Sequence, residues 1–183
     1  MSPEKNNALV TKYPKIFKHA TRSIKGPQLP IYLFMFECGD GWYNILNSAC
    51  YLIQNHIDWK RKQRANSLRY NRALRRALAG DTKGLYHYYD RHGFLNIEKD
   101  IALAVSKAEY RKVPDAPSQV EATQVKEKFG GLRFYYSGGD SYIDGVTSMA
   151  ESMSYVTCEE CGKPGTQTSG GWIQTLCDAH KSK

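Results

Sequence analysis

The spacing of apolar residues predicts helices along much of the chain. Between Trp42 and Ile57, apolar residues recur every three or four positions, which is typical of a helix with one buried face. The same spacing predicts three more helices, over residues 59–80, 97–108 and 143–153. A small polar residue stands just before three of the four helices and is expected to cap each: Asp40, Asn96 and Asp140.

An alternation of apolar and polar residues predicts a β-hairpin over residues 123–136. Gly130 and Gly131 lie at its centre and are expected to form a two-residue turn. Such a turn places Lys128 opposite Arg133 and puts Phe129 on the apolar face, against the core. The other face then displays four polar side chains, Lys126, Lys128, Arg133 and Tyr135.

Together these elements predict an α+β fold in which helices pack on a small antiparallel sheet. Leu29–Cys38 is expected to form a further strand, and a short helix is expected near Lys15–Arg22 in an otherwise irregular N-terminus. We divide the chain into an N-terminal arm (1–30), an α+β body that contains the basic helical segment 59–80 (31–156), and a C-terminal zinc-binding unit (157–183).

The most specific motif is a set of metal-ligating residue types near the C-terminus. Cys158 and Cys161 form a Cys-x-x-Cys pair, and after a gap of 15 residues Cys177 and His180 form a Cys-x-x-His pair. Three thiolates and one imidazole complete the closed donor set of a structural zinc site, and the gap suits two knuckles joined by a short hairpin. Gly162 is expected to allow the sharp turn of the first knuckle. The motif therefore predicts one structural zinc ion.

Two other uses of these four residues stay open. A catalytic zinc would keep one coordination position free, and disulfides would need an oxidising compartment. The remaining cysteines, Cys38 and Cys50, lie among apolar residues and are expected to be buried, unreactive thiols. No apolar run has the form of a signal peptide or the length of a bilayer span, so we expect a soluble cytoplasmic protein without membrane contact.

Basic residues are distributed unevenly. The net charge is +8, and residues 59–79 contain eight Lys and Arg but no acidic residue. Such a cluster attracts polyanions, of which nucleic acid is the commonest in a cytoplasm. We expect contacts from one helix and from the polar hairpin face, through Arg69, Arg72, Arg75, Arg76, Lys126, Lys128, Arg133 and Tyr135. The alternatives are a solvated helix face, an ordinary exposed strand face and an acidic protein partner.

Three carboxylates form the best catalytic candidate, Glu37, Asp40 and Glu127. If they converge, they would hold a divalent ion for phosphodiester cleavage. The competing interpretations are a capped helix start for Asp40 and pairing with a cation for Glu127. The sequence contains no phosphate-binding glycine loop, nucleophile elbow or paired-histidine hydrolase motif, so a non-enzymatic protein is favoured.

Three segments together resemble a family of bacteriophage and prophage proteins. They are Glu37–Tyr43, Val125–Tyr135 and the C-terminal Cys-Cys-Cys-His set, which is also similar to zinc-ribbon or treble-clef knuckles. The resemblance implies the cytoplasm of a host cell as the location and carries no activity to any residue here. The basic stretch Trp59–Lys83 looks like an insertion relative to this family.

These observations support three functions. The first is a non-enzymatic zinc protein of phage type that binds nucleic acid as an accessory factor. The second is a protein-interaction module that targets a host or phage protein, with Trp172 and Tyr155 beside the zinc knuckles. The third is a metal-dependent nuclease.

Overall fold

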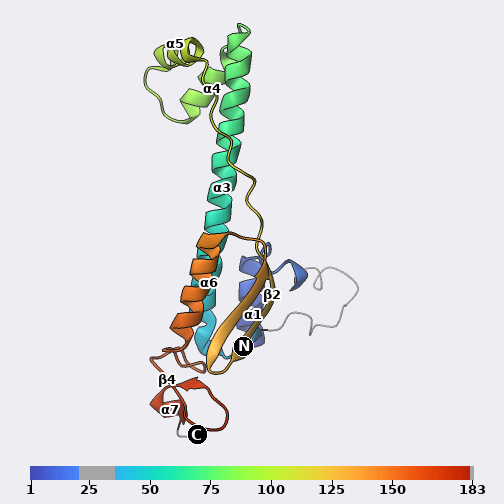
Figure 1. Ribbon diagram of the computed structural model, residues 1–183, viewed down its shortest axis with the longest axis vertical. Coiled ribbons are helices and arrows are strands. Elements are labelled where there is room, and N and C mark those ends of the chain that lie inside the picture. Colours follow the sequence, from blue (N-terminus) through green and yellow to red (C-terminus); the bar gives the residue numbers. More distant parts are fainter. Residues whose placement is uncertain (21–35, 182–183) are drawn as a thin grey trace. The chain divides into compact units, whose positions relative to one another are not determined.

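The computed structural model describes residues 1–20 and 36–181, and it confirms an α+β fold (Figure 1). The described helices are α1 (Pro3–Lys12), the short 3-10 helix η2 (Asp40–Trp42), α3 (Tyr43–Leu78), α4 (Lys83–Arg91), α5 (Ile97–Lys107), α6 (Ser141–Ser154) and α7 (Asp178–Lys181). The strands are β1 (Phe36–Glu37), β2 (Glu121–Lys128), β3 (Gly131–Ser137), β4 (Thr166–Gln167) and β5 (Thr175–Leu176).

The chain forms two compact units. The first unit consists of residues 1–57 and 118–183, and the second consists of residues 58–117. Helix α3 contributes its first part to the first unit and the rest to the second, so the two helices expected around Trp42–Ile57 and 59–80 are one continuous helix. The zinc-binding unit expected at 157–183 lies inside the first unit.

The core of the first unit lies between helices and a mixed sheet of strand order β1-β2-β3. Strand β1 pairs with β2 in parallel, and β2 pairs with β3 in antiparallel orientation. The core is made mainly of large apolar side chains, including Phe17, Trp42, Leu46, Ile53, Leu132 and Ile143. Cys38 and Cys50 are buried free thiols, as predicted, and burial raises the pKa of Cys38 to about 12.

The N-terminus is more ordered than its sequence suggests. Residues 3–12, expected to be irregular, form helix α1, because Leu9 and Val10 supply an apolar edge that is buried in the core. The Tyr13 hydroxyl donates a hydrogen bond of 3.0 Å to the carbonyl oxygen of Asn47 in α3. The helix expected near Lys15–Arg22 and the strand expected at Leu29–Cys38 extend outside the described residues; β1 is the described part of that strand.

The hairpin of β2 and β3 confirms the predicted strand pair but has a different turn. Phe129 and Gly130 occupy the turn with φ angles of +54° and +74°, so Lys128 pairs with Gly131. Positive φ at both central residues is the type I′ geometry, which matches the twist of a hairpin. Gly131 instead begins β3, at a position where the ring of Tyr155 leaves no room for a side chain: a Cβ atom there would lie 2.4 Å from the ring.

The different turn corrects two expectations about side chains. Lys126, and not Lys128, lies opposite Arg133. Phe129 is 65% exposed at the end of the hairpin, where we expected it to be buried. The rest of the alternation is confirmed, since Val125, Leu132 and Phe134 are buried and Tyr135 is exposed.

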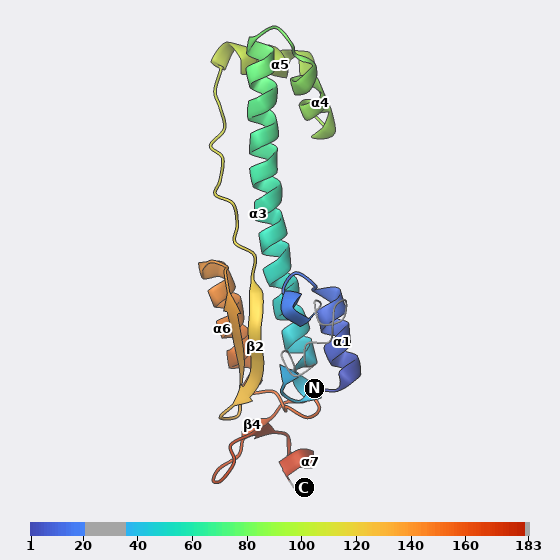
Figure 2. The ribbon, with the colours of Figure 1, turned by 90° about the vertical axis from the view of Figure 1, so that its right-hand side faces the viewer.

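Helix α6 covers the free edge of β3, and Figure 2 shows the helix alongside the hairpin. The backbone N–H of Leu132 donates to the Ser154 hydroxyl at 2.8 Å, and that of Phe134 donates to the Glu151 carboxylate at 3.0 Å. These bonds satisfy strand-edge donors that would otherwise attract another strand. Helix α6 begins as predicted, because the side chain of Asp140 accepts a hydrogen bond from the N–H of Ile143.

The second unit has a small core between α3, α4 and α5. Its buried residues are Tyr70, Ala73, Leu74, Ala77, Leu85, Tyr88, Tyr89 and Ala104. The helical spacing over residues 59–80 predicts one apolar face of Tyr70, Ala73, Leu74, Ala77 and Leu78, and all of these except Leu78 are buried. Two side chains hold the segment that returns from α5. Asn71 exchanges hydrogen bonds of 2.8 and 2.9 Å with the backbone of Arg111, whose guanidinium lies 3.9 Å from the ring centre of Tyr70.

Two of the predicted helix caps do not form. The side chain of Asn96 makes no cap hydrogen bond to α5. The residue at the N-cap of η2 is Gly39, and the carboxylate of Asp40 instead accepts a hydrogen bond of 2.6 Å from the N–H of Ser2, at the start of α1. Asp40 therefore joins α1 to the segment before α3.

Candidate metal centre

The four predicted ligands converge in space. The donor atoms of Cys158, Cys161, Cys177 and His180 all lie within 4.8 Å of one another. Among the described residues, no other group of three or more metal-ligating side chains comes together in this way. The sulfurs of Cys161 and Cys177 are 3.7 Å apart. His180 Nδ1 lies 3.4 Å from the sulfur of Cys158 and 3.2 Å from that of Cys177.

These separations fit one ion at the centre of a tetrahedron. Bond lengths of about 2.3 Å to sulfur and about 2.0 Å to nitrogen imply S···S separations of about 3.8 Å and S···N separations of about 3.5 Å. The observed 3.7, 3.4 and 3.2 Å are close to these values. The group can therefore hold one four-coordinate metal ion, with no position left for water or substrate.

Each ligand is placed by a short local structure. Cys158 and Cys161 lie on a tight turn, in which Gly162 has a φ of +77°, as predicted, and donates its N–H to the carbonyl of Cys158 at 2.8 Å. Strands β4 and β5 form the short hairpin that leads to Cys177. Helix α7 follows at once, so Cys177 and His180 lie one helical turn apart and face the same point.

The backbone around the first turn favours a thiolate. Burial alone would raise the pKa of Cys158, but the N–H groups of Cys177, Cys161 and Glu160 point at its sulfur and, with the His180 side chain, lower that pKa to about 6. N–H groups directed at sulfur stabilise the charged form and orient it for a metal. The peptide geometry is thus already suited to a metal thiolate.

The segment Gly39–Trp42 packs against the turn that carries Cys158 and Cys161. The N–H of Gly41 donates to the carbonyl of Glu159 at 2.6 Å, and the indole N–H of Trp42 donates to the carbonyl of Thr157 at 2.8 Å. A Cβ atom at Gly41 would lie 2.1 Å from the carbonyl oxygen of Cys158. Only glycine leaves room for this approach, which is the reason for Gly-x-Gly at this point of the chain.

A second contact joins the metal unit to the end of the β2–β3 hairpin. The hydroxyl of Thr175 donates to the carbonyl of Gly130 at 2.5 Å, and the side-chain amide of Gln167 donates to the carbonyl of Phe129 at 3.1 Å. Thr175 and Gln167 belong to β5 and β4, which hold the second ligand pair. The metal site therefore fixes the hairpin turn as well as its own loop.

The three carboxylates considered as a catalytic candidate have separate roles. Glu127 accepts a hydrogen bond of 2.7 Å from the N–H of Gly130 in the hairpin turn, and Asp40 holds the start of α1. Glu37 is exposed on β1. They form no group able to hold a metal within residues 1–20 and 36–181. The buried carboxylate beside the metal unit is Glu159, which accepts a 2.8 Å hydrogen bond from the N–H of Gly39.

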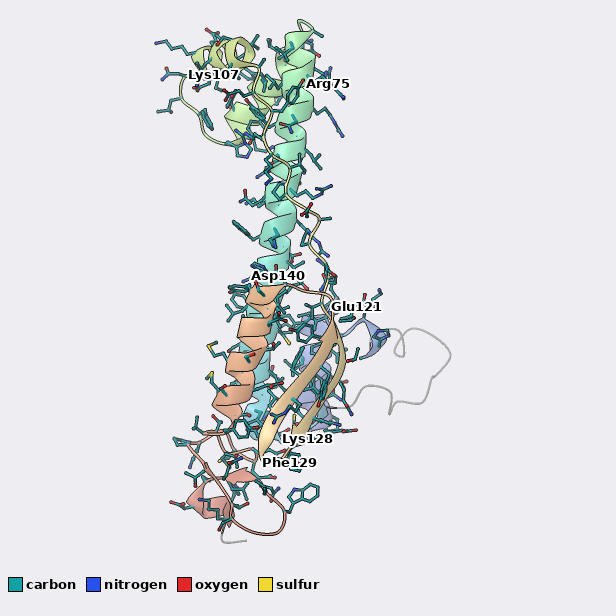
Figure 3. All side chains as sticks on the ribbon, in the orientation of Figure 1. Arg75, Lys107, Glu121, Lys128, Phe129 and Asp140 are labelled. Atoms are coloured by element: carbon teal, nitrogen blue, oxygen red, sulfur yellow. The ribbon has the colours of Figure 1, made fainter. Side chains whose placement is uncertain are left out.

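The predicted cationic residues fall into two groups in different units. Arg69, Arg72, Arg75 and Arg76 are all exposed on α3 in the second unit, opposite its buried face. Arg76 pairs with Asp81, and Arg69 donates a hydrogen bond of 3.4 Å to the neutral side chain of Asn66. In the described part of the chain, Arg72 and Arg75 have no hydrogen-bonding or ionic partner. Figure 3 labels Arg75 on this helix.

The second cationic group lies on the hairpin in the first unit. Lys126 is placed over the ring of Tyr135, with its nitrogen 5.7 Å from the ring centre. Arg133 is engaged internally, because it donates to the hydroxyl of Tyr155 at 2.6 Å and lies 4.0 Å from Glu151. Arg133 is therefore a structural residue of the hairpin, which leaves Lys126, Lys128 and Tyr135 as the accessible members of the predicted face.

Comparison with family models, with curated proteins and with solved structures gave no match to this chain. The relationship to phage and prophage proteins thus stays a prediction. No helix within the described residues is long and apolar enough to cross a membrane. The conclusions about function that follow depend on the residues themselves.

Proposed function

We propose that this chain is a non-enzymatic nucleic-acid-binding accessory protein with one structural zinc ion. The arginine face of α3 binds phosphates, and the zinc ion stabilises the first unit. One observation carries the proposal, namely the exposed row of Arg69, Arg72, Arg75 and Arg76, in which only Arg76 has an acidic partner among the described residues. Spacings of three and four residues put these guanidinium groups along one side of a helix, as contact with a phosphate backbone requires.

Zinc is the metal that suits the four donors best. Three thiolates and one imidazole in a closed tetrahedral arrangement are typical of structural zinc, whereas magnesium and calcium prefer oxygen ligands. Elemental analysis of the purified protein should find one zinc per chain. A Cys161→Ser variant should hold markedly less zinc, and a wild-type protein that retains no transition metal after purification contradicts this assignment.

The charge distribution separates phosphate binding from simple solubility. The second unit contains fourteen Lys and Arg against seven Asp and Glu, whereas the first unit contains twelve against eleven. A face that serves only for solvation works equally well with either sign of charge, and it is usually laced with ion pairs. The surplus of unpaired arginine on one helix favours a polyanion as the partner.

A matched pair of variants tests the arginine face. In the first, Arg69, Arg72, Arg75 and Arg76 are all changed to Gln. The control removes four exposed cations from other helices and loops of the same unit, by changing Lys83, Arg91, Lys99 and Lys112 to Gln, so the net charge falls equally. Binding to a duplex of random sequence is measured over a salt series for both variants and for wild type.

The arginine variant should lose most of the affinity. The slope of log K against log salt concentration should become shallower by about 3 to 4, since each phosphate contact contributes about 0.9. The control variant should lose much less of the affinity. Equal losses in both variants would show that only net charge matters, and no binding by wild type at low salt would refute the proposal.

A protein-interaction module is the second candidate, and a groove in the first unit favours it. The groove has a volume of about 270 Å³ and lies between α3 and α6. Its walls are mostly apolar and include Ile45, Leu52, Val146, Met149 and Met153. Methionine-lined grooves adapt to apolar partners. If a protein from host lysate binds stoichiometrically after nuclease treatment, and Met149→Lys prevents this, the second candidate replaces the first.

A further inference from the structure

The end of the β2–β3 hairpin carries an exposed aromatic residue in an unfavourable backbone conformation. Phe129 has a φ of +54°, and its side chain is 65% exposed. Asn and Gly are preferred in this position of a type I′ turn, and a bulky residue there is strained. Burial does not offset the strain at Phe129, because most of the ring is in contact with solvent. Strain of this kind points to a use for the exposed ring.

A second exposed aromatic residue lies on the neighbouring loop of the metal unit. Trp172 is 76% exposed, and the next residue, Ile173, packs beside the hairpin turn: its side chain would lie 3.1 Å from a Cβ atom at Gly130. The hydrogen bonds from Gln167 and Thr175 to the turn fix the same junction. Phe129 and Trp172 are thus the sequence neighbours of Gly130 and Ile173, which meet at this junction.

Lysines lie beside two exposed rings of the hairpin, those of Phe129 and Tyr135. The nitrogen of Lys128 lies 5.4 Å from the ring centre of Phe129, and Lys126 lies over Tyr135, which is itself exposed. Figure 3 shows Lys128 and Phe129 together at the end of the hairpin. Two acidic residues lie on the neighbouring strands: Glu37, whose Cα pairs with that of Lys126, and Glu127, whose carboxylate accepts a hydrogen bond from the turn N–H of Gly130. We call Lys126, Lys128, Phe129, Tyr135 and Trp172 the aromatic platform.

We propose that the aromatic platform binds single-stranded nucleic acid by stacking unpaired bases on Phe129 and Trp172. This inference rests on the proposed nucleic-acid-binding function but uses a different surface, in the first unit. Exposed aromatic rings with lysines beside them are the two components of sites that bind single strands with little sequence preference. Bases in a duplex are already stacked, so the platform distinguishes unpaired from paired segments.

The metal site provides the rigidity that such a platform needs. Trp172 lies between the two ligand pairs, on a loop that begins at β4 and ends at β5. The Thr168 N–H donates to the carbonyl of Gln174 at 2.8 Å, which closes the base of that loop. A loop held at both ends loses less conformational entropy on binding than a free one. The zinc ion thus contributes to base stacking without touching the nucleic acid.

Three labelled probes test the platform with the full-length, zinc-loaded protein. They are a 12-nucleotide oligothymidylate, a 12-unit abasic strand with the same phosphates but no bases, and a 12-base-pair duplex. Fluorescence anisotropy gives the affinity for each. Wild type should bind the oligothymidylate at least about fivefold more tightly than the abasic strand, because base stacking adds to the phosphate contacts.

The decisive variant is Phe129→Asn combined with Trp172→Ser. Asn followed by Gly is a favoured type I′ turn, so the first change removes the ring while preserving the hairpin. Affinity for the oligothymidylate should fall between about fivefold and 100-fold, to the level of the abasic strand, with duplex affinity unchanged. A double variant with Leu95→Ser and Tyr86→Ser removes exposed apolar surface from the second unit and should bind like wild type.

The outcomes separate the two proposals. If the platform variant binds oligothymidylate like wild type, or if wild type binds the abasic strand equally well, base stacking on the platform is refuted. If only the four-arginine variant loses affinity for the duplex, that result tests the arginine face and not the platform. If wild type binds neither strand but binds a poly-glutamate peptide in a manner that requires Phe129 and Trp172, the partner is an acidic protein segment and the platform proposal is overturned.

Discussion

The two units of this chain differ in how they are stabilised and in where their charge lies. The first unit combines a mixed sheet, a large apolar core and a metal site, with nearly balanced charge. The second unit has three helical segments around a small core, with Lys and Arg twice as numerous as Asp and Glu. Like charges repel one another and oppose compact folding. The excess of Lys and Arg is carried by the unit with the smaller core, much of it along the exposed side of helix α3.

The two cores also differ in the kind of contact on which they depend. In the first unit, Gly41 and Trp42 contact the turn around Cys158, more than 110 residues later in the chain. In the second unit, Leu74 and Leu85 are buried by helices that follow one another closely. The first unit is thus held by long-range contacts that a metal can reinforce, and the second by local helix packing.

Metal removal should have the largest effect and should affect the first unit selectively. Structural zinc contributes about 10–16 kcal/mol in small zinc peptides, and chelation should cost the first unit several kcal/mol of stability. Hydrogen exchange measured by mass spectrometry should show faster exchange in residues 157–181 and at the hairpin turn, with α4 and α5 unchanged. Uniform loss of protection across both units would show that the chain unfolds as one cooperative body.

A cavity in the small core should be the next largest effect. Leu74 is fully buried in the second unit, and Leu74→Ala should destabilise that unit by about 2–5 kcal/mol. Denaturant unfolding, followed by hydrogen exchange of α4 and α5, measures it. The exposed Leu68 on the same helix serves as the control, and Leu68→Ala should change stability by less than about 0.5 kcal/mol. Zinc content should be unchanged in both variants.

A methyl group at Gly41, which packs against the turn around Cys158, should have a smaller but specific effect on stability and zinc retention. Gly41→Ala places a Cβ atom 2.1 Å from the Cys158 carbonyl, and the forced shift should cost about 1–3 kcal/mol and weaken zinc retention. Gly145→Ala in α6 is the control, since a Cβ atom there meets nothing within 4 Å. That change should stabilise the helix by about 0.5–1 kcal/mol. Thermal unfolding and competition with a zinc chelator measure both.

The smallest expected effect is a pH dependence at Asp40. The N–H of Ser2 donates to its carboxylate and, with Lys5 nearby, holds the pKa of Asp40 below its usual range. A lowered pKa in the folded state means that the charge stabilises the protein above the unfolded pKa of about 3.9 and ceases to do so as the pH falls through the folded pKa. Because Asp40 is partly exposed, Asp40→Asn should cost less than about 1 kcal/mol at pH 7.

The pH profile checks this interpretation of Asp40. The difference in unfolding free energy between wild type and Asp40→Asn should vanish at low pH, where both side chains are neutral. The exposed loop residue Asp115 gives a control variant, Asp115→Asn, which should change stability by less than about 0.5 kcal/mol at pH 7. A difference that persists at low pH would mean that the amide itself disrupts the start of α1.

Local patterns in the sequence were sufficient for the helical segments of α3, for α5 and α6, for the two strands of the hairpin and for the four metal ligands. They did not reveal α1, which was expected to be irregular, or α4. Helical spacing places Tyr70 and Leu74 on the same face of a helix regardless of where that helix packs in the fold, because residues three or four apart lie on one side. The ligand pairs are also local, since each Cys-x-x-Cys or Cys-x-x-His turn fixes its own two donors. Residue spacing along the chain therefore carries this information without any knowledge of the tertiary structure.

Only the tertiary structure decided the hairpin register and the role of Gly41. The turn lies at Phe129 and Gly130, and Gly131 begins β3 where the ring of Tyr155 leaves no room for a side chain. Likewise, Gly41 is needed because the turn around Cys158 lies against it. Contacts between residues distant in sequence depend on how the elements pack, and they produce no repeating pattern in the sequence of the segments involved. The exposed Phe129 and the aromatic platform could not be predicted for the same reason.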